Sequence, residues 1–206
     1  MMLTCSLANA QKAFKEGILV YHVTLDPPEN QEGVIQYTGT YTITIKDKQV
    51  KKELKMDNGF GNVMLFNEKE QTVYTLKEMQ GKKYAIQIEY TSLEQKRARF
   101  ENFSIKEKGK DADIAGLPVN RGIVTYKDGT TKDLQFSKEW EPEVLLFEQL
   151  PGIKVLPLIF VSRTDDGMQM HFTAQQVLAQ PVESSIFKIP QDYKVMSSQE
   201  YRQLSR

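Results

Sequence analysis

The sequence contains only two histidines and one cysteine, residue types on which many hydrolytic triads and zinc sites depend. Its only histidines are His22 and His171, and both lie in runs where apolar and polar residues alternate, which is typical of strands. A hydrolytic triad or a zinc site needs a histidine held close to a nucleophile or to further ligands. We interpret both histidines as structural or exposed residues, and we expect neither a catalytic site nor a metal site.

Two other motifs could suggest enzymes but have simpler explanations. The carboxylate pairs Asp165-Asp166 and Asp111/Asp113 lie where reversals are expected, and Asp is favoured in turns because its side chain hydrogen-bonds the nearby backbone. Gly59-Phe60-Gly61 resembles the start of a dinucleotide-binding loop, but the third glycine and the following helix are missing. The residues therefore predict a protein that is not an enzyme and needs no cofactor.

Charge is balanced along the chain, with 27 basic and 27 acidic residues that are interspersed. Nucleic-acid-binding proteins gather positive charge on one face because they neutralise phosphates. The densest basic stretch, residues 46–55, alternates with Val50, Leu54 and Met56, so we interpret its lysines as the solvated face of a strand. We expect no nucleic-acid partner and, because no long apolar run is present, no membrane-spanning helix.

The first ten residues differ from the rest of the chain. Residues 1–10 carry no charge and end in Ala8-Asn9-Ala10, the small-x-small pattern that signal peptidase cuts. We interpret them as the remnant of a truncated signal peptide and expect a periplasmic or secreted protein. Two alternatives stay open: an uncleaved terminus with an accidental Ala-x-Ala, or a lipid anchor on Cys5, the single cysteine.

From Gly17 onward, short alternating segments separated by turn motifs predict one mainly β domain over residues 11–206, built as an antiparallel meander. The clearest hairpin joins residues 121–126 to residues 131–136 around Lys127-Asp128-Gly129, where glycine suits the positive φ of the turn. A further reversal is expected at residues 108–111, after a strand over residues 100–107.

Two helices are expected beside the sheet. Pro142, followed by Val144, Leu145, Phe147 and Leu150 and ended by Pro151-Gly152, predicts a central helix over about residues 142–150. The Ser197-x-x-Glu200 spacing fits a capping box and predicts a short C-terminal helix. Residues 91–98 are compatible with a short helix, a polar edge strand or a loop.

Methionine and aromatic residues are frequent in the strand segments. Methionine fills irregular or adaptable apolar surfaces, so these residues would form either an ordinary core or the lining of a hydrophobic groove. The candidate groove residues are Met64, Phe66, Tyr74, Met79, Trp140, Leu145, Leu146, Phe160, Met168 and Met170.

The order of several motifs resembles a family of exported proteins from Gram-negative bacteria. The motifs are Glu16-Gly17-Ile18, Val73-Tyr74-Thr75-Leu76, residues 123–129, residues 173–177 and residues 185–190. That family is similar in fold to the periplasmic lipoprotein carrier LolA, an unclosed, strongly curved β-sheet covered by helices, whose concave face holds acyl chains. The resemblance implies a half-barrel with a hydrophobic groove, but no activity, because fold does not determine function.

Two functions fit this sequence. The first is a non-enzymatic binding module whose concave face, covered by the helix near residues 144–150, holds a lipid or another hydrophobic ligand. The second is a cell-envelope scaffold with a filled core, which binds a partner protein through a sheet edge or a loop. An open apolar cavity would favour the first.

Overall fold

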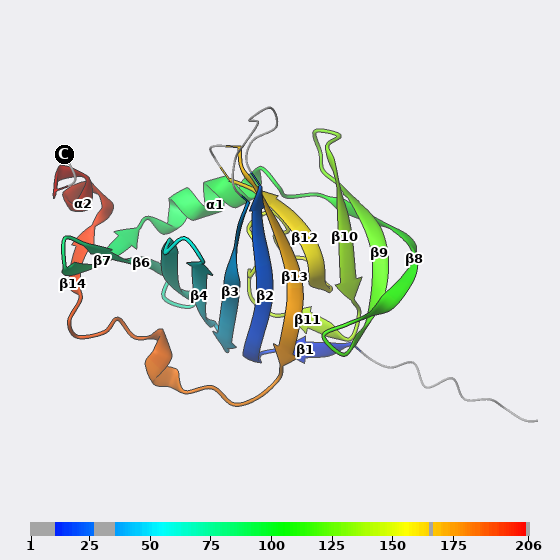
Figure 1. The fold of residues 1–206 in the computed structure, drawn as a ribbon, viewed down its shortest axis with the longest axis horizontal. Coiled ribbons are helices and arrows are strands. Elements are labelled where there is room, and N and C mark those ends of the chain that lie inside the picture. The colour runs from blue at the N-terminus through cyan, green and yellow to red at the C-terminus, as the bar shows by residue number, and fades with distance from the viewer. Residues whose placement is uncertain (1–10, 27–35, 165–166, 205–206) are drawn as a thin grey trace, which may run out of the picture.

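The computed structural model describes residues 11–26, 36–164 and 167–204 (Figure 1). The predicted signal remnant, residues 1–10, lies outside the described residues. The described chain forms a twelve-stranded sheet in the order β14-β7-β6-β5-β4-β3-β2-β13-β12-β10-β9-β8, and a two-stranded sheet of β1 and β11. The terminal strands β14 and β8 do not pair with each other, so the large sheet is an unclosed, curved half-barrel. This confirms the predicted β-rich fold class.

The elements have the following bounds. The strands of the first half are β1 (Lys12–Phe14), β2 (Glu16–Asp26), β3 (Tyr37–Lys46), β4 (Gln49–Met56), β5 (Gly61–Asn67), β6 (Thr72–Met79) and β7 (Lys82–Ile88). Those of the second half are β8 (Ser104–Ile114), β9 (Leu117–Thr125), β10 (Thr131–Ser137), β11 (Trp140–Pro142), β12 (Leu156–Arg163), β13 (Gln169–Leu178) and β14 (Lys194–Ser197). The helices are α1 (Tyr90–Ala98), the 3₁₀ helix η1 (Ser184–Phe187) and α2 (Ser198–Leu204).

Strand alternation places one continuous apolar face on the inside of the curve. In β2, residues alternate between buried and partly buried positions, and Leu19, Tyr21 and Val23 are fully buried. Strands β2 to β7 follow one another as antiparallel neighbours, and β13 then returns to pair with β2 in the middle of the sheet. The central pair β2–β13 therefore joins the two halves of the chain around one core.

Several local predictions are confirmed. β9 and β10 form the expected hairpin, and Asp128 Oδ1 accepts hydrogen bonds from the Thr130 amide at 2.9 Å and from its hydroxyl at 2.6 Å. The capping box forms at α2: the Ser197 amide donates to Glu200 Oε2 at 2.7 Å, and the Glu200 amide donates to Ser197 Oγ at 3.2 Å. Residues 91–98, whose sequence is compatible with a helix, an edge strand or a loop, lie in α1.

The reversal predicted at residues 108–111 is wrong. β8 continues to Ile114, and its register against β9 shifts between Glu107 and Gly109, so Lys108 is the extra residue of a bulge beside Gly109, whose φ is 137°. The chain turns later, at Ala115 and Gly116, which have φ of 51° and 75°. A glycine between charged residues thus served to bend a strand rather than to end it.

The predicted central helix over residues 142–150 is also wrong. Pro142 ends the short strand β11, and residues 143–150, which we call the inner segment, have no regular helix or strand. Side chains from distant parts of the chain donate hydrogen bonds to its carbonyl groups: Lys48 to Glu143 at 3.2 Å, Arg97 to Leu145 at 3.3 Å and Tyr126 to Gln149 at 2.8 Å. The buried side chains of the inner segment are Val144, Leu146, Phe147 and Leu150.

Candidate functional site

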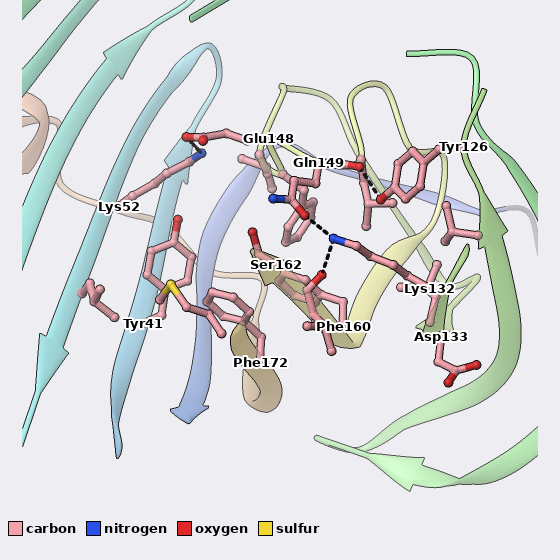
Figure 2. A pocket seen from close by; sticks show the side chains of 18 of the residues that line it. Tyr41, Lys52, Tyr126, Lys132, Asp133, Glu148, Gln149, Phe160, Ser162 and Phe172 are labelled. Atoms are coloured by element: carbon pink, nitrogen blue, oxygen red, sulfur yellow. Dashed lines mark hydrogen bonds and ion pairs between the residues drawn. The ribbon is translucent and has the colours of Figure 1, made fainter. Parts of the chain in front are cut away.

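A cavity of about 210 Å³ lies between the concave face of the large sheet and the inner segment (Figure 2). Strands β3, β4 and β5 form one wall, and β9, β10, β12 and β13 form the other. The lining is mainly apolar and includes Leu54, Met64, Leu146, Phe147, Phe160, Met170 and Phe172. The curvature of the sheet and the irregular course of the inner segment together leave this space.

Sheet register explains why these side chains converge. Directly opposed residues on neighbouring strands point to the same face. Met64 is opposite Lys52, and Phe160 is opposite Phe172. The Phe160 and Phe172 rings stack with centroids 4.6 Å apart, and Tyr21 packs edge-on against Phe160 at 5.6 Å. The cavity floor on this side is therefore a packed aromatic cluster rather than a set of mobile side chains.

Four of the predicted groove residues, Met64, Leu146, Phe160 and Met170, line the cavity. Four others lie elsewhere. Phe66 is buried in the core with its ring stacked on Tyr90 at 5.9 Å. Trp140 packs edge-on against Phe14 beside the two-stranded sheet, Leu145 is half-buried outside the cavity lining, and Met168 precedes β13.

Tyr74 and Met79 belong to other surfaces. Tyr74 is opposite Leu65, one residue out of phase with Phe66, so it points to the convex face and lines a shallow groove with Phe187 of η1. Met79 lines an open groove of about 680 Å³ beside α2, where the Tyr201 hydroxyl contacts its sulfur at 3.8 Å. Asn62 lies at the boundary of this groove and the cavity, since it lines both.

The sequence interpretation missed Lys52, which belongs to the cavity wall. It is in phase with Val50 and Leu54 on the apolar face of β4 and is 6% exposed, so the interpretation of this stretch as a purely solvated face was wrong for this residue. Its neighbours do lie on the outer face, where Lys51 and Lys55 pair with Glu53 at 3.2 and 2.9 Å. The signal was visible in the sequence, because a lysine in phase with buried residues is unusual.

Lys52 has only distant charge compensation. Its Nζ lies 4.0 Å from Glu148 Oε1, on a side chain that is 44% exposed. Burial lowers the pKa of Lys52, and the Glu148 carboxylate opposes part of this effect. Figure 2 shows the Tyr41 hydroxyl pointing toward the same end of the cavity. Burial and the Glu148 charge raise the pKa of Tyr41, so its hydroxyl stays protonated and can donate a hydrogen bond.

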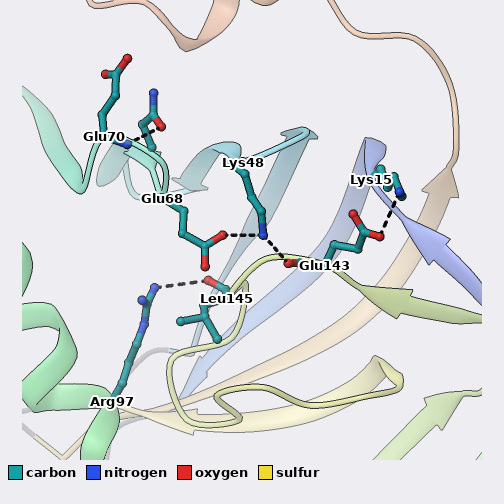
Figure 3. Close-up of polar contacts among 8 residues, drawn as sticks. Lys15, Lys48, Glu68, Glu70, Arg97, Glu143 and Leu145 are labelled. Carbon is teal, nitrogen blue, oxygen red and sulfur yellow. Dashed lines mark hydrogen bonds and ion pairs between the residues drawn. The ribbon is translucent and has the colours of Figure 1, made fainter.

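A second buried cation, Arg97 of α1, lies behind this end of the cavity and is 4% exposed. Its guanidinium packs over the Phe66 ring at 5.2 Å, and Nη2 donates to the Leu145 carbonyl (Figure 3). Among the residues that the structure describes, Nε and Nη1 have no hydrogen-bond partner. Burial lowers the pKa of Arg97, while the nearby Glu148 opposes this shift.

At the opposite end of the cavity, the polar side chains have close hydrogen-bond partners. Lys132, in phase with Leu134 on β10, donates to Gln149 Oε1 at 2.5 Å and to the Val161 carbonyl at 3.5 Å. Tyr126 donates to the Gln149 carbonyl, and burial raises the pKa of Tyr126 to about 12. Sequence analysis also missed Lys132, although the same phase argument would have placed it on the inner face.

The described residues show no arrangement suited to metal binding: no group of three or more His, Cys, Asp or Glu within them is placed to hold an ion. His171 and His22 both lie out of phase with the concave residues Phe172 and Tyr21, and His171 Nε2 lies 2.9 Å from Asp26 Oδ2. None of the helices in the described ranges is long and apolar enough to cross a membrane. The chemistry that the site offers is burial of apolar groups beside a cation.

Comparison with known proteins gives distant likenesses only. No family model and no curated protein sequence matches the chain. A crystal structure of MucB in complex with MucA(peri) aligns with 87% of this chain and 57% of the MucB chain, with 12% identity and a TM-score of 0.43. A structure of PNGF-II aligns with 91% of this chain and 33% of that protein, with 13% identity and a TM-score of 0.48. This chain thus spans little more than half of the first protein and a third of the second, and neither match assigns it to a family.

Proposed function

We propose that the protein is a non-enzymatic binding module that holds an apolar ligand between the concave face of its sheet and the inner segment. The observation that carries this proposal is the cavity of about 210 Å³ with apolar walls from two sides of the half-barrel. An apolar cavity of about 150 Å³ is large enough to stay dry and bind benzene. The space here accommodates one alkyl chain segment or one aromatic ring.

The proposed setting is the periplasm or the exterior of the cell. Ala8-Asn9-Ala10 and the resemblance to exported proteins with a LolA-like fold support it. In that setting, a carrier or sensor of hydrophobic molecules would shield an apolar group from water. The alternative is that a lipid on Cys5 anchors the protein to a membrane. Mass spectrometry of protein recovered from cells distinguishes a chain that carries this lipid from one that does not.

A second candidate function is a scaffold that binds another protein. It is favoured by one observation: the inner segment already fills much of the concave face with Val144, Leu146, Phe147 and Leu150, of which Leu146 is 2% exposed. A sheet whose interior is filled by its own chain has less room for a large ligand. This candidate predicts no small-molecule adduct and a protein partner at an edge or loop.

The test measures whether the cavity is a binding site. Ser162 lies in the cavity wall, and Figure 2 shows its hydroxyl directed into the space. We expect the apolar dye phenylnaphthylamine to bind with increased fluorescence, and Ser162→Phe to weaken binding at least about tenfold because the new ring occupies the space. Ser162→Ala is the matched control and should bind as the unchanged protein does.

The outcomes separate the two candidates. Loss of binding in Ser162→Phe alone, with a circular dichroism spectrum unchanged from the parent, supports the binding module. Equal dye binding by all three proteins, or none by any, rejects the cavity as the site. The protein is then recovered from the periplasm without detergent and measured by native mass spectrometry. A mass without an apolar adduct supports the scaffold.

A further inference from the structure

At one end of the cavity, the buried positive charge of Lys52 is only weakly compensated. Lys52 of the cavity wall has Glu148 as its acidic partner, with 4.0 Å between Nζ and Oε1, and the nearby positive charge of Arg97 lowers its pKa further. Arg97, by contrast, is influenced by three carboxylates, those of Glu148, Glu68 and Glu94, so Lys52 is the less compensated of the two buried cations. Glu148 is itself 44% exposed, so water screens its compensation.

Within the described residues, the other carboxylates nearby do not pair with Lys52. Glu68 is engaged by Lys48 at 3.0 Å, and Figure 3 shows that Lys48 also reaches the Glu143 carbonyl. Asp133 borders the cavity but is exposed, is out of phase with Leu134 on β10, and is directed away from the space in Figure 2. Lys52 is therefore a buried ammonium group in the wall of an apolar cavity with room for an anion beside it.

Lys132, the other lysine of the cavity wall, differs from Lys52 in its hydrogen-bond partners. Lys132 Nζ already has Gln149 Oε1 and the Val161 carbonyl as acceptors, which satisfies it without a ligand. A ligand's anionic group gains most where the buried charge is least compensated. The polar end of a ligand should thus be at Lys52 and Tyr41, and its apolar end should be at Phe160, Phe172 and Met170.

We infer that the site binds a single-chain organic anion, in which one alkyl or aryl body fills the apolar cavity and a carboxylate pairs with Lys52 and accepts a hydrogen bond from Tyr41. This inference rests on the proposed binding function and names its ligand class. The volume of about 210 Å³ selects a single chain over a lipid with several acyl chains. The buried positive charge selects an anion over a neutral or cationic molecule.

The experiment compares probes that share one alkyl chain and differ in the head group: octanoate, octanol and octylammonium. Isothermal titration calorimetry on the full chain should show octanoate binding about tenfold or more tighter than octanol, because a charge-assisted hydrogen bond exceeds the 1.4 kcal/mol of a tenfold change. Octylammonium should bind more weakly than octanol. Lys52→Met should abolish the preference, so that this variant binds octanoate no more tightly than octanol.

Two further variants keep the test decisive. Lys51→Met, one residue away on the outer face, is the matched control and should keep the preference for octanoate. Glu148→Gln removes the competing carboxylate and should increase octanoate affinity, so it tests the inference even if Lys52→Met does not fold. Equal affinity for octanoate and octanol overturns the inference but leaves the binding module standing. Failure of all three probes to bind overturns both.

Discussion

At the scale of single residues, Lys52 carries an energetic cost that a ligand would offset. Burial holds its pKa below the ordinary value near 10.5, so the folded chain binds the Lys52 proton less tightly than the unfolded chain does. Stability attributable to this residue therefore rises with pH, through the window between its lowered folded pKa and its unfolded pKa. A buried charge with a weak partner often costs more than an apolar replacement of similar size.

We predict that Lys52→Met, without ligand, is more stable than the parent by roughly 1 kcal/mol at neutral pH. The advantage should shrink as the pH rises from the lowered pKa of folded Lys52 toward about 10, near the pKa of an unfolded lysine, because the buried group loses its charge over this range. Urea unfolding at both pH values measures this. Lys51→Met should change stability by less than about 0.5 kcal/mol, as expected of a surface position. A marked loss of stability in Lys52→Met would show that its ion pair with Glu148 outweighs the cost of burial.

At the scale of elements, the inner segment depends on hydrogen bonds from the elements around it. An irregular buried segment must have its carbonyl groups satisfied, and here the donors are Lys48 in the turn between β3 and β4, Arg97 in α1 and Tyr126 directly after β9. The Tyr126 hydroxyl bond to Gln149, at 2.8 Å, is the shortest of the three. Since the inner segment closes one side of the cavity, we expect its local stability to affect binding of the proposed ligand.

Tyr126→Phe should therefore loosen the inner segment. Loss of this hydrogen bond leaves the Gln149 carbonyl without its donor and should cost about 1 kcal/mol. Hydrogen–deuterium exchange should accelerate in residues 147–150, while the central strands β2 and β13 stay protected. Tyr74→Phe is the matched control, because Tyr74 lies on the convex face away from the inner segment. Unchanged exchange in residues 147–150 would mean that apolar packing alone holds the segment.

At the scale of the whole molecule, the C-terminal part packs on a core of its own. β14 pairs in parallel with β7 at the end of the sheet, with Met196 opposite Ile86. Met196, Tyr84 and Ile86 form a small buried cluster separate from the main core. Small satellite clusters open at lower free energy than the main core, so this end should unfold locally before the rest.

Met196→Ala should release β14 and α2 from the sheet. Truncating this buried side chain removes about 2 kcal/mol or more of packing from the small cluster. Exchange in residues 194–204 should rise at least about tenfold, while the urea midpoint of the main core stays close to that of the parent. Val195→Ala, at a neighbouring position that is 53% exposed, should change neither. A large shift of the main midpoint would show that both clusters unfold as one unit.

Much of the fold could be predicted because its signals are local. The alternation in β2, the Asp128-Gly129 turn and the Ser197–Glu200 capping box each depend on residues within a few positions of one another. The face of a strand, by contrast, depends on register against its neighbours. Tyr74 and Met64 are both large apolar residues in strands. Met64 points into the cavity, whereas Tyr74 is opposite Leu65 and therefore points to the convex side.

By itself, the sequence determined that this chain forms a mainly antiparallel β fold, because alternation and turn chemistry act over short distances. Only the tertiary structure decided what fills the half-barrel. Residues 143–150 have an apolar pattern that suits a helix, but donors from Lys48, Arg97 and Tyr126 pair with their carbonyl groups and hold them irregular. The cavity and the buried charge of Lys52 follow from that packing between segments distant in sequence, which no local pattern records.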